Sequence, residues 1–531
     1  MIVYWIFATI ALIALIIWKG YIKPYSHWKN MGVPQAHPWF IVGDSWPTIF
    51  RIKGVKEWID WMYNMHPGSK YVGMYHFYLP TLVLKDPEII KQLTIKDFDY
   101  FTDHGNFAVS EEVDPLWSKN LFALKGQRWR DMRSVLSGSF TSNKMRLMYE
   151  LIREEAEKFA IFFKSKNEDL LELNMKDSFC RYTTDVIAST SFGIKVNSLE
   201  TPNNEFYIMG KEVSDFTKIT ILLKFLAVIV CPWFLKMFNI GFLSKKVRVF
   251  FTNIIEETIK LREEKGVVRP DMINLLLEVK RGSAKKKEED IPDDGFAVIR
   301  EEADASATPH KRKVNITNQD IASQAMVFFL AGFDSVSSAM SYIAYELALN
   351  PEIQAKLRKE INEVWAKCNG KPSYEDILGM KYMDMVVSES LRKWPVAPAA
   401  DRICVKPYTL EPTSPGEPTI TFKVNDTLWI PIISIHHDEK YYPDPEKFIP
   451  ERFSEANKGN ILPYTYLPFG VGPRACIGSR FALLEIKAIM FYLLKNFEVV
   501  LTKNTRIPLK FVRKSIALTP EGGIPLGLKS L

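Results

Sequence analysis

The segment Pro468–Ala482, PFGVGPRACIGSRFA, constrains the fold of this chain more than any other, because one cysteine stands in it between a glycine-rich loop and an amphipathic run. We expect its three glycines to permit backbone angles that a side chain forbids, so that the loop turns tightly and presents amide N–H groups to the sulfur. The apolar spacing over Arg480–Leu494 predicts a helix whose positive end favours the thiolate form of Cys476. Cys476 is therefore a candidate metal ligand.

The residues around Cys476 indicate which metal centre this is. Phe469 would pack beside the sulfur and exclude water, and Arg474 would hold a propionate of a porphyrin. The alternative is a structural cysteine buried in a turn, but a turn needs neither the aromatic ring nor the arginine at these spacings. The segment therefore predicts a haem iron with Cys476 as its axial ligand.

The segment resembles the haem-binding loop of the cytochromes P450, the haem-thiolate monooxygenases, and the resemblance extends over nearly the whole chain. It implies a mainly α fold with small β-sheets, an N-terminal membrane anchor helix, and heme b (iron protoporphyrin IX) as cofactor. In that family the thiolate pushes electron density toward iron-bound oxygen. The stretches FFLAGFDSVS and DGFAVIREEAD are similar to the animal microsomal, xenobiotic-metabolising type, most of all to its insect family-nine members.

A second motif, AGFDS, lies within the long helix expected over Thr317–Leu349 and matches the family's oxygen-activating helix. Gly332 costs stability in a helix, and together with Ala331 it would leave a notch against the haem. Asp334 and Ser335 would supply a carboxylate and a hydroxyl for proton delivery. The family usually has threonine at this last position. Serine lacks the methyl group that restricts the rotamer, so we expect less ordered proton delivery and more loss of electrons to peroxide.

The resemblance also implies a buried charge network that supports the thiolate loop. Glu389 and Arg392 stand three apart on one face of a predicted helix, a spacing that is commonplace by itself. Arg452, in the downstream run PERF, would complete the network. Removal of one member would leave a charge buried without its partner.

Other residues are expected around the haem propionates. Trp129 and Arg133 lie one helical turn apart, and in the family both point at a propionate. Arg402 and His437 are further candidates. The segments expected to reach over the substrate are Phe107–Phe122, Thr217–Phe225, Ala325–Phe329, Val396–Ala399 and Leu518–Gly522. Apolar residues are common in most of them, so the pocket would orient its substrate by shape.

The chain is expected to have three parts: a transmembrane anchor over residues 1–20, a proline-rich connector over 21–44, and a haem-thiolate catalytic domain over 45–531. Residues 2–18 carry no charge, and at about 1.5 Å per residue a helix over them spans roughly 26 Å. Lysines follow at once, which places the rest of the chain in the cytosol. A cleaved secretory signal is the alternative, but it would need a basic leading region. The resemblance then implies a single-pass protein of the endoplasmic reticulum membrane.

Composition limits the partners. The five cysteines are odd in number and irregularly spaced, which fits a reducing compartment. The net charge of +7 is a mild excess that does not call for nucleic acid, and the charged stretch 280–313, in which both signs interleave, is typical of a surface loop. The run Ile221–Leu235 is too short for a confident second span, and we expect it either to dip into the bilayer surface or to form a buried core helix.

These features predict a monooxygenase that inserts one oxygen atom into lipophilic small molecules, xenobiotics or endogenous lipids. The resemblance implies electrons from NADPH through NADPH–cytochrome P450 reductase, with cytochrome b5 as a further candidate donor and membrane lipid as a partner. The reductase would dock near Cys476, on basic residues such as Arg128, Arg133, Lys144 and Arg146. Two alternatives stay open: a haem-thiolate isomerase or dehydratase, and a non-enzymatic haem sensor. Neither needs the acid and hydroxyl pair at 334 and 335.

Periodicity predicts the remaining elements. Helices are expected over Leu147–Ser165, Val247–Glu264, Pro351–Lys367 and Ser373–Lys393, and strands over Tyr71–Met74, Thr81–Lys85, Leu428–Ile432 and Glu498–Leu501.

Overall fold

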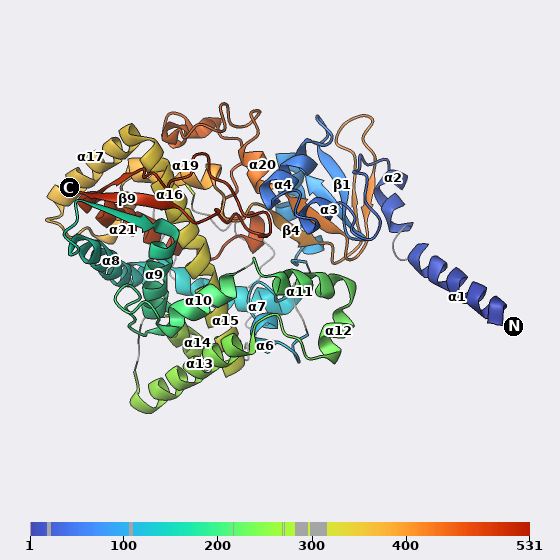
Figure 1. Ribbon diagram of the computed structural model, residues 1–531, viewed down its shortest axis with the longest axis horizontal. Coiled ribbons are helices and arrows are strands. Elements are labelled where there is room, and N and C mark those ends of the chain that lie inside the picture. The colour runs from blue at the N-terminus through green and yellow to red at the C-terminus, as the bar shows by residue number, and fades with distance from the viewer. Residues whose placement is uncertain are drawn as a thin grey trace.

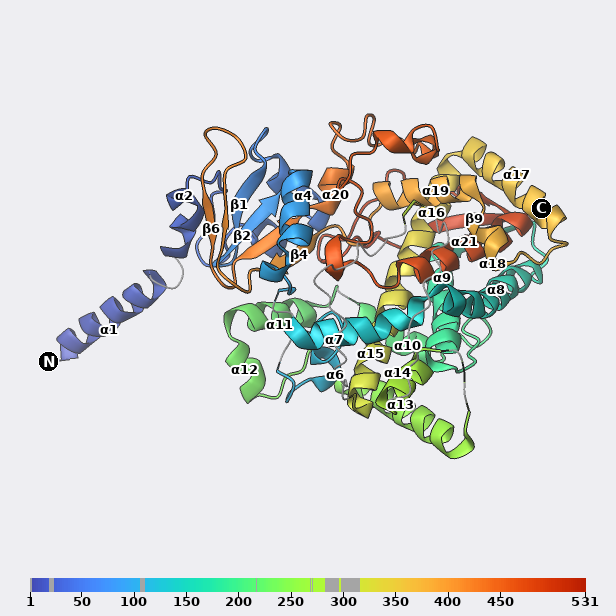
Figure 2. The same cartoon turned by 180° about the vertical axis from the view of Figure 1, so that it is seen from behind.

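The computed structural model shows a mainly α chain with small β-sheets, which confirms the fold class expected from the sequence (Figure 1). It describes residues 2–18, 23–105, 110–215, 217–267, 269, 271–281, 296–297 and 316–531. Most of the charged stretch 280–313 and residues 107–109 of the first expected substrate segment therefore lie outside the described residues. Most of the long helices gather at one end of the body and the larger sheet lies at the other (Figure 2).

A group of long helices forms the core. The longer helices are α4 (Val55–Asn64), α7 (Gly126–Ser137), α8 (Ser142–Lys164), α9 (Met175–Ile187), α10 (Glu205–Ser214), α13 (Lys245–Lys265), α14 (Met272–Lys280), α17 (Pro351–Lys367), α19 (Lys381–Lys393) and α21 (Ser479–Asn496). The shorter ones are α2 (His27–Asn30), α3 (Trp46–Ile49), α5 (Pro87–Lys91), α6 (Pro115–Ser118) and α20 (Ile432–His436). Apolar side chains of α8, α9, α19 and α21 make one buried cluster. The helix α21 is buried over nearly its whole length, so the segment after Cys476 is held by the core.

The long helix predicted over 317–349 is present and has three sections. They are α15 (Asn318–Leu330), the π-helical turn η7 (Ala331–Val336) and α16 (Ser337–Leu349). Thr317 and Asp320 form a capping box at its start, which satisfies two orphan N–H groups. Among the described residues it is the one helix long and apolar enough to cross a membrane, but 56% of that apolar window is buried inside the protein. It is therefore a core helix, and its π-helical turn lies at the centre of the molecule.

The larger sheet brings distant segments together. Its strand order is β1 (Tyr71–His76), β2 (Leu79–Leu84), β7 (Thr427–Ile430) and β4 (Ala400–Ile403), with β2 and β7 parallel and the other pairs antiparallel. A second sheet joins β3 (Leu170–Asn174), β9 (Pro525–Ser530) and β8 (Phe497–Val500), and a third joins β5 (Tyr408–Leu410) to β6 (Ile420–Phe422). Because β4 is an edge strand, another segment can pair with it. The N–H group of Ile403 donates to the carbonyl oxygen of Asp103 at 2.7 Å.

The four predicted strands are present within a few residues of their expected ends, but the helix expected over Ser373–Lys393 is wrong as one element. The structure has a short α18 (Tyr374–Leu378) followed by α19. Between them Met380 has an extended ψ of 96°. The apolar periodicity runs on across the break because both helices bury their apolar faces against the same core.

The run predicted to dip into the bilayer or to form a core helix is two helices, α11 (Ile219–Val230) and α12 (Pro232–Met237). The break falls where Pro232 lacks a backbone N–H group. Ile221 and Phe225 pack against the core, whereas Leu223 and Trp233 are 54% and 64% exposed. The alternative of a buried core helix is therefore wrong for this segment.

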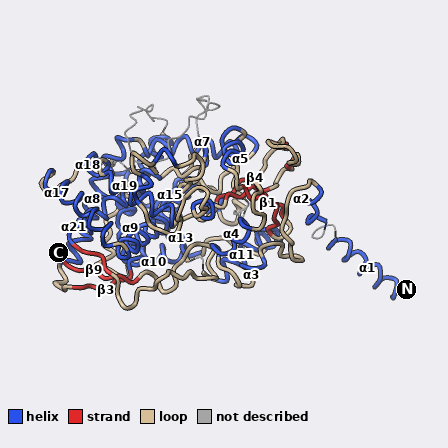
Figure 3. The backbone as a smooth tube through the Cα atoms, turned by 90° about the horizontal axis from the view of Figure 1, so that it is seen from above, coloured by secondary structure: helices blue, strands red, loops and turns tan. Residues whose placement is uncertain are grey.

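The N-terminal segment is helical over α1 (Ile2–Ile17), roughly 24 Å at about 1.5 Å per residue. Several of its large apolar side chains are exposed, including Tyr4, Trp5 and Phe7. Figure 3 shows α1 extending away from the body. Exposed apolar surface of this kind is typical of an interaction site, and the membrane anchor stays a prediction.

Candidate haem-thiolate site

The loop that carries Cys476 is held in a tight turn by its own backbone. The N–H group of Cys476 donates to the carbonyl oxygen of Phe469 at 2.9 Å, and the N–H group of Ala475 donates to that of Gly472 at 2.8 Å. Gly470 and Gly472 have positive φ angles of 80° and 68°, as the sequence predicts. A Cβ atom at Gly472 would also collide with the carbonyl oxygen of Thr94.

Gly478 differs from the other two glycines. Its φ angle is −94°, which any residue can adopt, so the expectation that all three glycines are needed for their backbone angles is wrong for this one. Gly478 is the residue before the first turn of α21. Its N–H group lowers the pKa of the Cys476 thiol, and so acts as the predicted donor to sulfur.

Cys476 differs from the other four cysteines in its exposure. Among the five cysteines it is the one whose side chain is exposed, yet burial raises the pKa of its thiol. The Gly478 N–H group and Arg133 act in the opposite direction but do not outweigh burial. The preference of the helix start for the thiolate stays a prediction for the metal-bound protein. A bound cation deprotonates a coordinating thiol outright, so a metal ion fits this sulfur.

Arg474, Trp129 and Arg133 lie together beneath the loop. The Arg474 guanidinium carbon stands 4.0 Å from the centre of the Trp129 ring, a cation–π contact. Arg474 also donates to the carbonyl oxygens of Thr102 and Leu124 at 2.7 and 2.8 Å. Arg133 donates to the carbonyl oxygen of Ala475 at 2.8 Å. Both arginines therefore fasten α7 and its surroundings to the cysteine loop.

Two buried arginines, Arg402 and Arg474, lie near each other beside the cysteine loop. Arg402 donates to the carbonyl oxygen of Val471 at 2.9 Å, but its Nε atom is buried and has no hydrogen-bond partner among the described residues. Burial lowers the pKa of Arg402 to about 10 and that of Arg474 to about 9. Burial also lowers the pKa of Lys125, although Asp103 raises it in part.

This cluster fits a group with two carboxylates. Asp103 lies 3.3 Å from Arg474 and Asp401 contacts His104, whereas the Arg402 Nε atom has no hydrogen-bond partner among the described residues. Because burial penalises each unpaired cation, additional anionic charge stabilises the cluster. The two propionates of heme b are such charges, and the orphaned Arg402 Nε atom is a donor for one of them.

His104 belongs to the same cluster and was missed by the sequence analysis. Its Nδ1 atom lies 2.9 Å from Asp401 Oδ1, and its ring stacks on Phe122 at 4.6 Å. Burial lowers the pKa of His104 despite Asp401. No pattern in the sequence indicates this pair, because 297 residues separate its members.

The π-helical turn η7 contacts α21, the helix that follows Cys476. Ala331 is exposed on the inner face of this turn, and Ser335 donates from its hydroxyl to the Ala331 carbonyl oxygen at 2.5 Å. A Cβ atom at Gly332 would collide with Ile187 of α9. Gly332 therefore packs closely against α9, and the notch of Ala331 and Gly332 against the haem stays a prediction.

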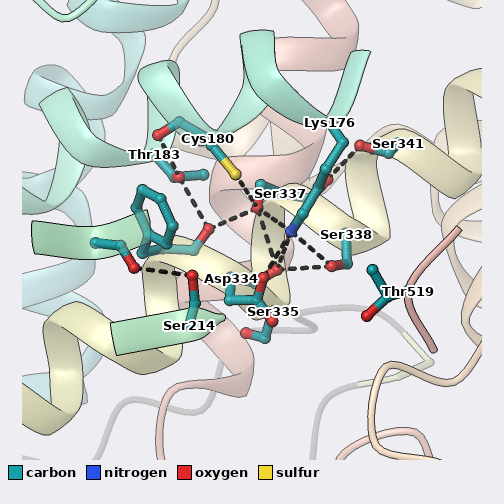
Figure 4. Close-up of polar contacts among 12 residues, drawn as sticks. Lys176, Cys180, Thr183, Ser214, Asp334, Ser335, Ser337, Ser338, Ser341 and Thr519 are labelled. Atoms are coloured by element: carbon teal, nitrogen blue, oxygen red, sulfur yellow. Dashed lines mark hydrogen bonds and ion pairs between the residues drawn. The ribbon is translucent and has the colours of Figure 1, made fainter. Parts of the chain in front are cut away.

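The Asp334 side chain points from the same turn toward α9 and contacts a lysine of that helix (Figure 4). The ammonium group of Lys176 lies 2.9 Å from Asp334 Oδ1. The same group donates to the backbone carbonyl oxygen of Asp334 at 2.8 Å. The sequence analysis did not find this lysine, since a single lysine at a helix start has no distinguishing pattern.

The three predicted members of the charge network meet in the core. Arg392 donates to both carboxylate oxygens of Glu389, at 2.8 and 2.9 Å, and both side chains are fully buried. Arg452 lies 3.4 Å from Glu389. The N–H group of Ile449 donates to the same carboxylate at 2.9 Å. Glu389 therefore joins α19 to the PERF segment.

A buried histidine extends this network toward the cysteine loop. The carbonyl oxygen of His436 accepts from Arg392 at 2.9 Å, and its ring contacts Leu467, just before Phe469. The neighbouring His437, a propionate candidate from the sequence, contacts Glu446 and the carbonyl oxygen of Lys393 instead. It lies with the Glu389 network and not with the cluster around Arg402.

Comparisons with known proteins agree with this geometry. A family model described as Cytochrome P450 matches residues 43–526. The chain is 42% identical to cytochrome P450 9e2 of Blattella germanica, over 99% of this chain and 97% of that protein. It is 37% identical to probable cytochrome P450 9f2 of Drosophila melanogaster, over 97% of each, and 36% identical to cytochrome P450 6k1 of Blattella germanica, over 98% and 96%. The predicted likeness to insect family-nine members is thus confirmed, and the chain belongs to the cytochrome P450 family of haem-dependent monooxygenases.

Proposed function

We propose that this protein is a monooxygenase of the endoplasmic reticulum membrane that inserts one atom of dioxygen into lipophilic small molecules, using electrons from NADPH through NADPH–cytochrome P450 reductase. The balanced reaction is RH + O₂ + NADPH + H⁺ → ROH + H₂O + NADP⁺. Bound haem supplies the activation of dioxygen. The observation that carries the proposal is that α21, directly behind Cys476, contacts the turn that holds Asp334 and Ser335.

The residues of the chain then have distinct roles. Cys476 binds the iron, and Phe469, whose carbonyl oxygen holds the Cys476 N–H group, keeps water from the sulfur. Ala331 leaves space above the porphyrin, while Asp334 and Ser335 hold and move protons. The propionates would be held by a set of buried or half-buried donors: Trp129, Arg133, Arg402 and Arg474.

The substrate is an apolar molecule, such as a plant toxin, an insecticide or an endogenous lipid. Phe122, in the first expected substrate segment, is 42% exposed although the preceding Leu121 is buried. The hydroxyl of Tyr342 donates to the carbonyl oxygen of Leu518 at 2.6 Å and fastens the last expected segment to α16. Rigid apolar walls of this kind select by shape.

The membrane is contacted by α1 and by the surface of α11 and α12. Exposed large apolar side chains gather on α11 and α12: Ile219, Leu223, Trp233, Phe234 and Met237. Apolar surface of this extent on a soluble body is typical of an interface, and tryptophan is favoured at the bilayer surface. A substrate dissolved in lipid would then reach the protein without crossing water.

The reductase docks on the face near Cys476, with cytochrome b5 as a second donor. Two of the basic residues expected there are already paired, Arg128 with Glu111 and Arg146 with Glu375. Arg133 is bound to the cysteine loop. Lys144 has no ion pair among the residues that the structure describes, so it is the strongest of the four candidates for an acidic partner. Raised salt should slow electron transfer if these charges guide docking.

The function is tested with purified holoenzyme and its reductase. We expect NADPH oxidation that needs both reductase and an apolar substrate, and a carbon monoxide difference spectrum with the Soret band of thiolate-ligated iron. Cys476→Ser should abolish that band, whereas the half-buried Cys368→Ser should retain it. Substrate turnover without reductase would favour the isomerase alternative. Haem binding without any turnover would favour a sensor.

A further inference from the structure

Lys176 makes an unusual number of contacts with the oxygen-activating turn. Its ammonium group lies 2.9 Å from Asp334 Oδ1 and donates to the Asp334 carbonyl oxygen at 2.8 Å. It also contacts the hydroxyl groups of Ser337 and Ser338, at 2.8 and 2.7 Å. One side chain from the first turn of α9 thus touches four oxygen atoms of the long helix (Figure 4).

The π-helical geometry explains why this part of the helix needs outside donors. A π-bulge disturbs the regular ladder and changes which backbone carbonyl groups are satisfied. The Phe333 carbonyl oxygen accepts from Ser337 and Thr183, at 2.6 and 3.2 Å. The Asp334 carbonyl oxygen accepts from Lys176 and Ser338, both at 2.8 Å. Lys176 is the one charged member among these donors.

The charge of Lys176 is maintained by its surroundings. Burial lowers the pKa of Lys176, but Cys180 and Asp334 act in the opposite direction and leave it above the usual value. Asp177, which follows Lys176 on α9, is a second carboxylate near the pair, and Tyr207, Arg181 and Lys211 lower its pKa despite burial. Burial raises the pKa of the Cys180 thiol, and burial with Asp334 raises the pKa of Tyr342 on α16. Lys176 is therefore the positive charge that neutralises Asp334.

Resting on the proposed monooxygenase function, we propose that Lys176 is a positioning residue for proton delivery: its ammonium group holds the Asp334 carboxylate charged and oriented, and so decides how much reducing power reaches the substrate. Productive turnover and leakage of electrons to peroxide differ in their overall equations. Productive turnover follows RH + O₂ + NADPH + H⁺ → ROH + H₂O + NADP⁺. Leakage follows O₂ + NADPH + H⁺ → H₂O₂ + NADP⁺. Both consume one NADPH, so peroxide formed per NADPH measures the partition.

Three substitutions separate charge from packing. Lys176→Gln keeps an amide donor for the turn but removes the charge. Lys176→Met removes both, and Lys176→Arg keeps the charge. Lys211→Met is the matched control, because Lys211 is 60% exposed on the neighbouring α10 and pairs with Asp177. All four are expressed as full-length holoenzymes.

For Lys176→Gln we expect unchanged haem content and thiolate Soret band, with peroxide per NADPH at least about twofold higher than in the wild type. The pH profile of coupling should also change, since Lys176 supplies the positive charge beside the Asp334 carboxylate. Lys176→Arg should restore both values, and Lys211→Met should change neither.

A non-catalytic readout is the melting temperature as a function of pH, measured in wild type, Lys176→Gln, Asp334→Asn and the double variant. If the two residues act as a pair, the double variant melts like Asp334→Asn alone. Additive effects, or unchanged coupling and pH profile in Lys176→Gln, overturn the proposal. Loss of haem in both Lys176→Gln and Lys176→Met also overturns it, because the lysine then only supports the turn. Failure of the proposed monooxygenase function is distinguishable from failure of the Lys176 proposal. In the former case the wild type would show no reductase-dependent NADPH oxidation.

Discussion

His436 accepts the backbone N–H group of Leu467 on its Nε2 atom at 2.8 Å. Its Nδ1 atom lies 3.0 Å from the carbonyl oxygen of Arg392. Because a backbone N–H group can only donate, Nε2 has no proton and Nδ1 carries one. This neutral ring therefore links the Glu389–Arg392 pair to the chain just before the cysteine loop, and a second proton would break the link.

Acid should destabilise the protein through this histidine. Burial, with Arg392, lowers the pKa of His436 from 6.5 to about 3. Between these values the unfolded chain binds a proton that the folded chain does not, so the stability is present above about pH 6.5 and is lost as pH falls toward 3. We expect the urea midpoint of His436→Gln to depend less on pH between about 7 and 5 than that of the wild type.

The matched control for His436 is His37→Gln, a change at an exposed histidine. It should follow the wild-type pH dependence. An equal fall of all three midpoints with pH would show that other groups carry the acid sensitivity.

Glu389→Ala should be produced without haem. The change leaves Arg392, fully buried, and Arg452 without their carboxylate, at a cost of about 3 to 5 kcal/mol. The carbon monoxide difference spectrum measures the outcome. Glu451→Ala is the control, because Glu451 lies beside Arg452 but is 43% exposed and pairs with Lys356 on the surface. Normal haem content in Glu389→Ala would contradict the role of the network.

Ser335→Thr should reduce peroxide release. The Ser335 hydroxyl donates to the Ala331 carbonyl oxygen, and the added methyl group of threonine restricts the rotamer that does so. We expect peroxide per NADPH to fall by about a factor of two at unchanged haem content. Unchanged coupling would remove serine as the cause of any leakage.

Membrane binding should persist in part when residues 1–20 are removed, because α11 and α12 retain an apolar surface. Trp233 and Phe238 are 64% and 56% exposed. Each such side chain contributes about 1.5 to 3 kcal/mol when buried, so Trp233→Ser with Phe238→Ser should weaken vesicle binding of the truncated protein at least about tenfold. The control is Ile161→Ser, at a residue that is 59% exposed on α8. If the truncated protein does not bind vesicles at all, α1 is the whole membrane contact.

The parts of the site that the sequence predicted are those with local spacing. The cysteine loop, the AGFDS turn and the Glu389–Arg392 pair each lie within a few residues, and their chemistry follows from residue types at fixed intervals. The same locality explains the helices, whose apolar periodicity reports one buried face. Gly478 was misinterpreted because local spacing does not reveal the backbone angle that a glycine adopts.

Tertiary structure alone decided the contacts between distant segments. Lys176 and Asp334 are 158 residues apart, and His104 and Asp401 are 297 apart. Such pairs depend on helix packing and strand order, which no short pattern encodes. Burial likewise decided the pKa values of the site. The sequence supplies Arg402, Arg474 and Cys476. Only their enclosure in the core lowers the pKa of the two arginines and raises the pKa of the thiol.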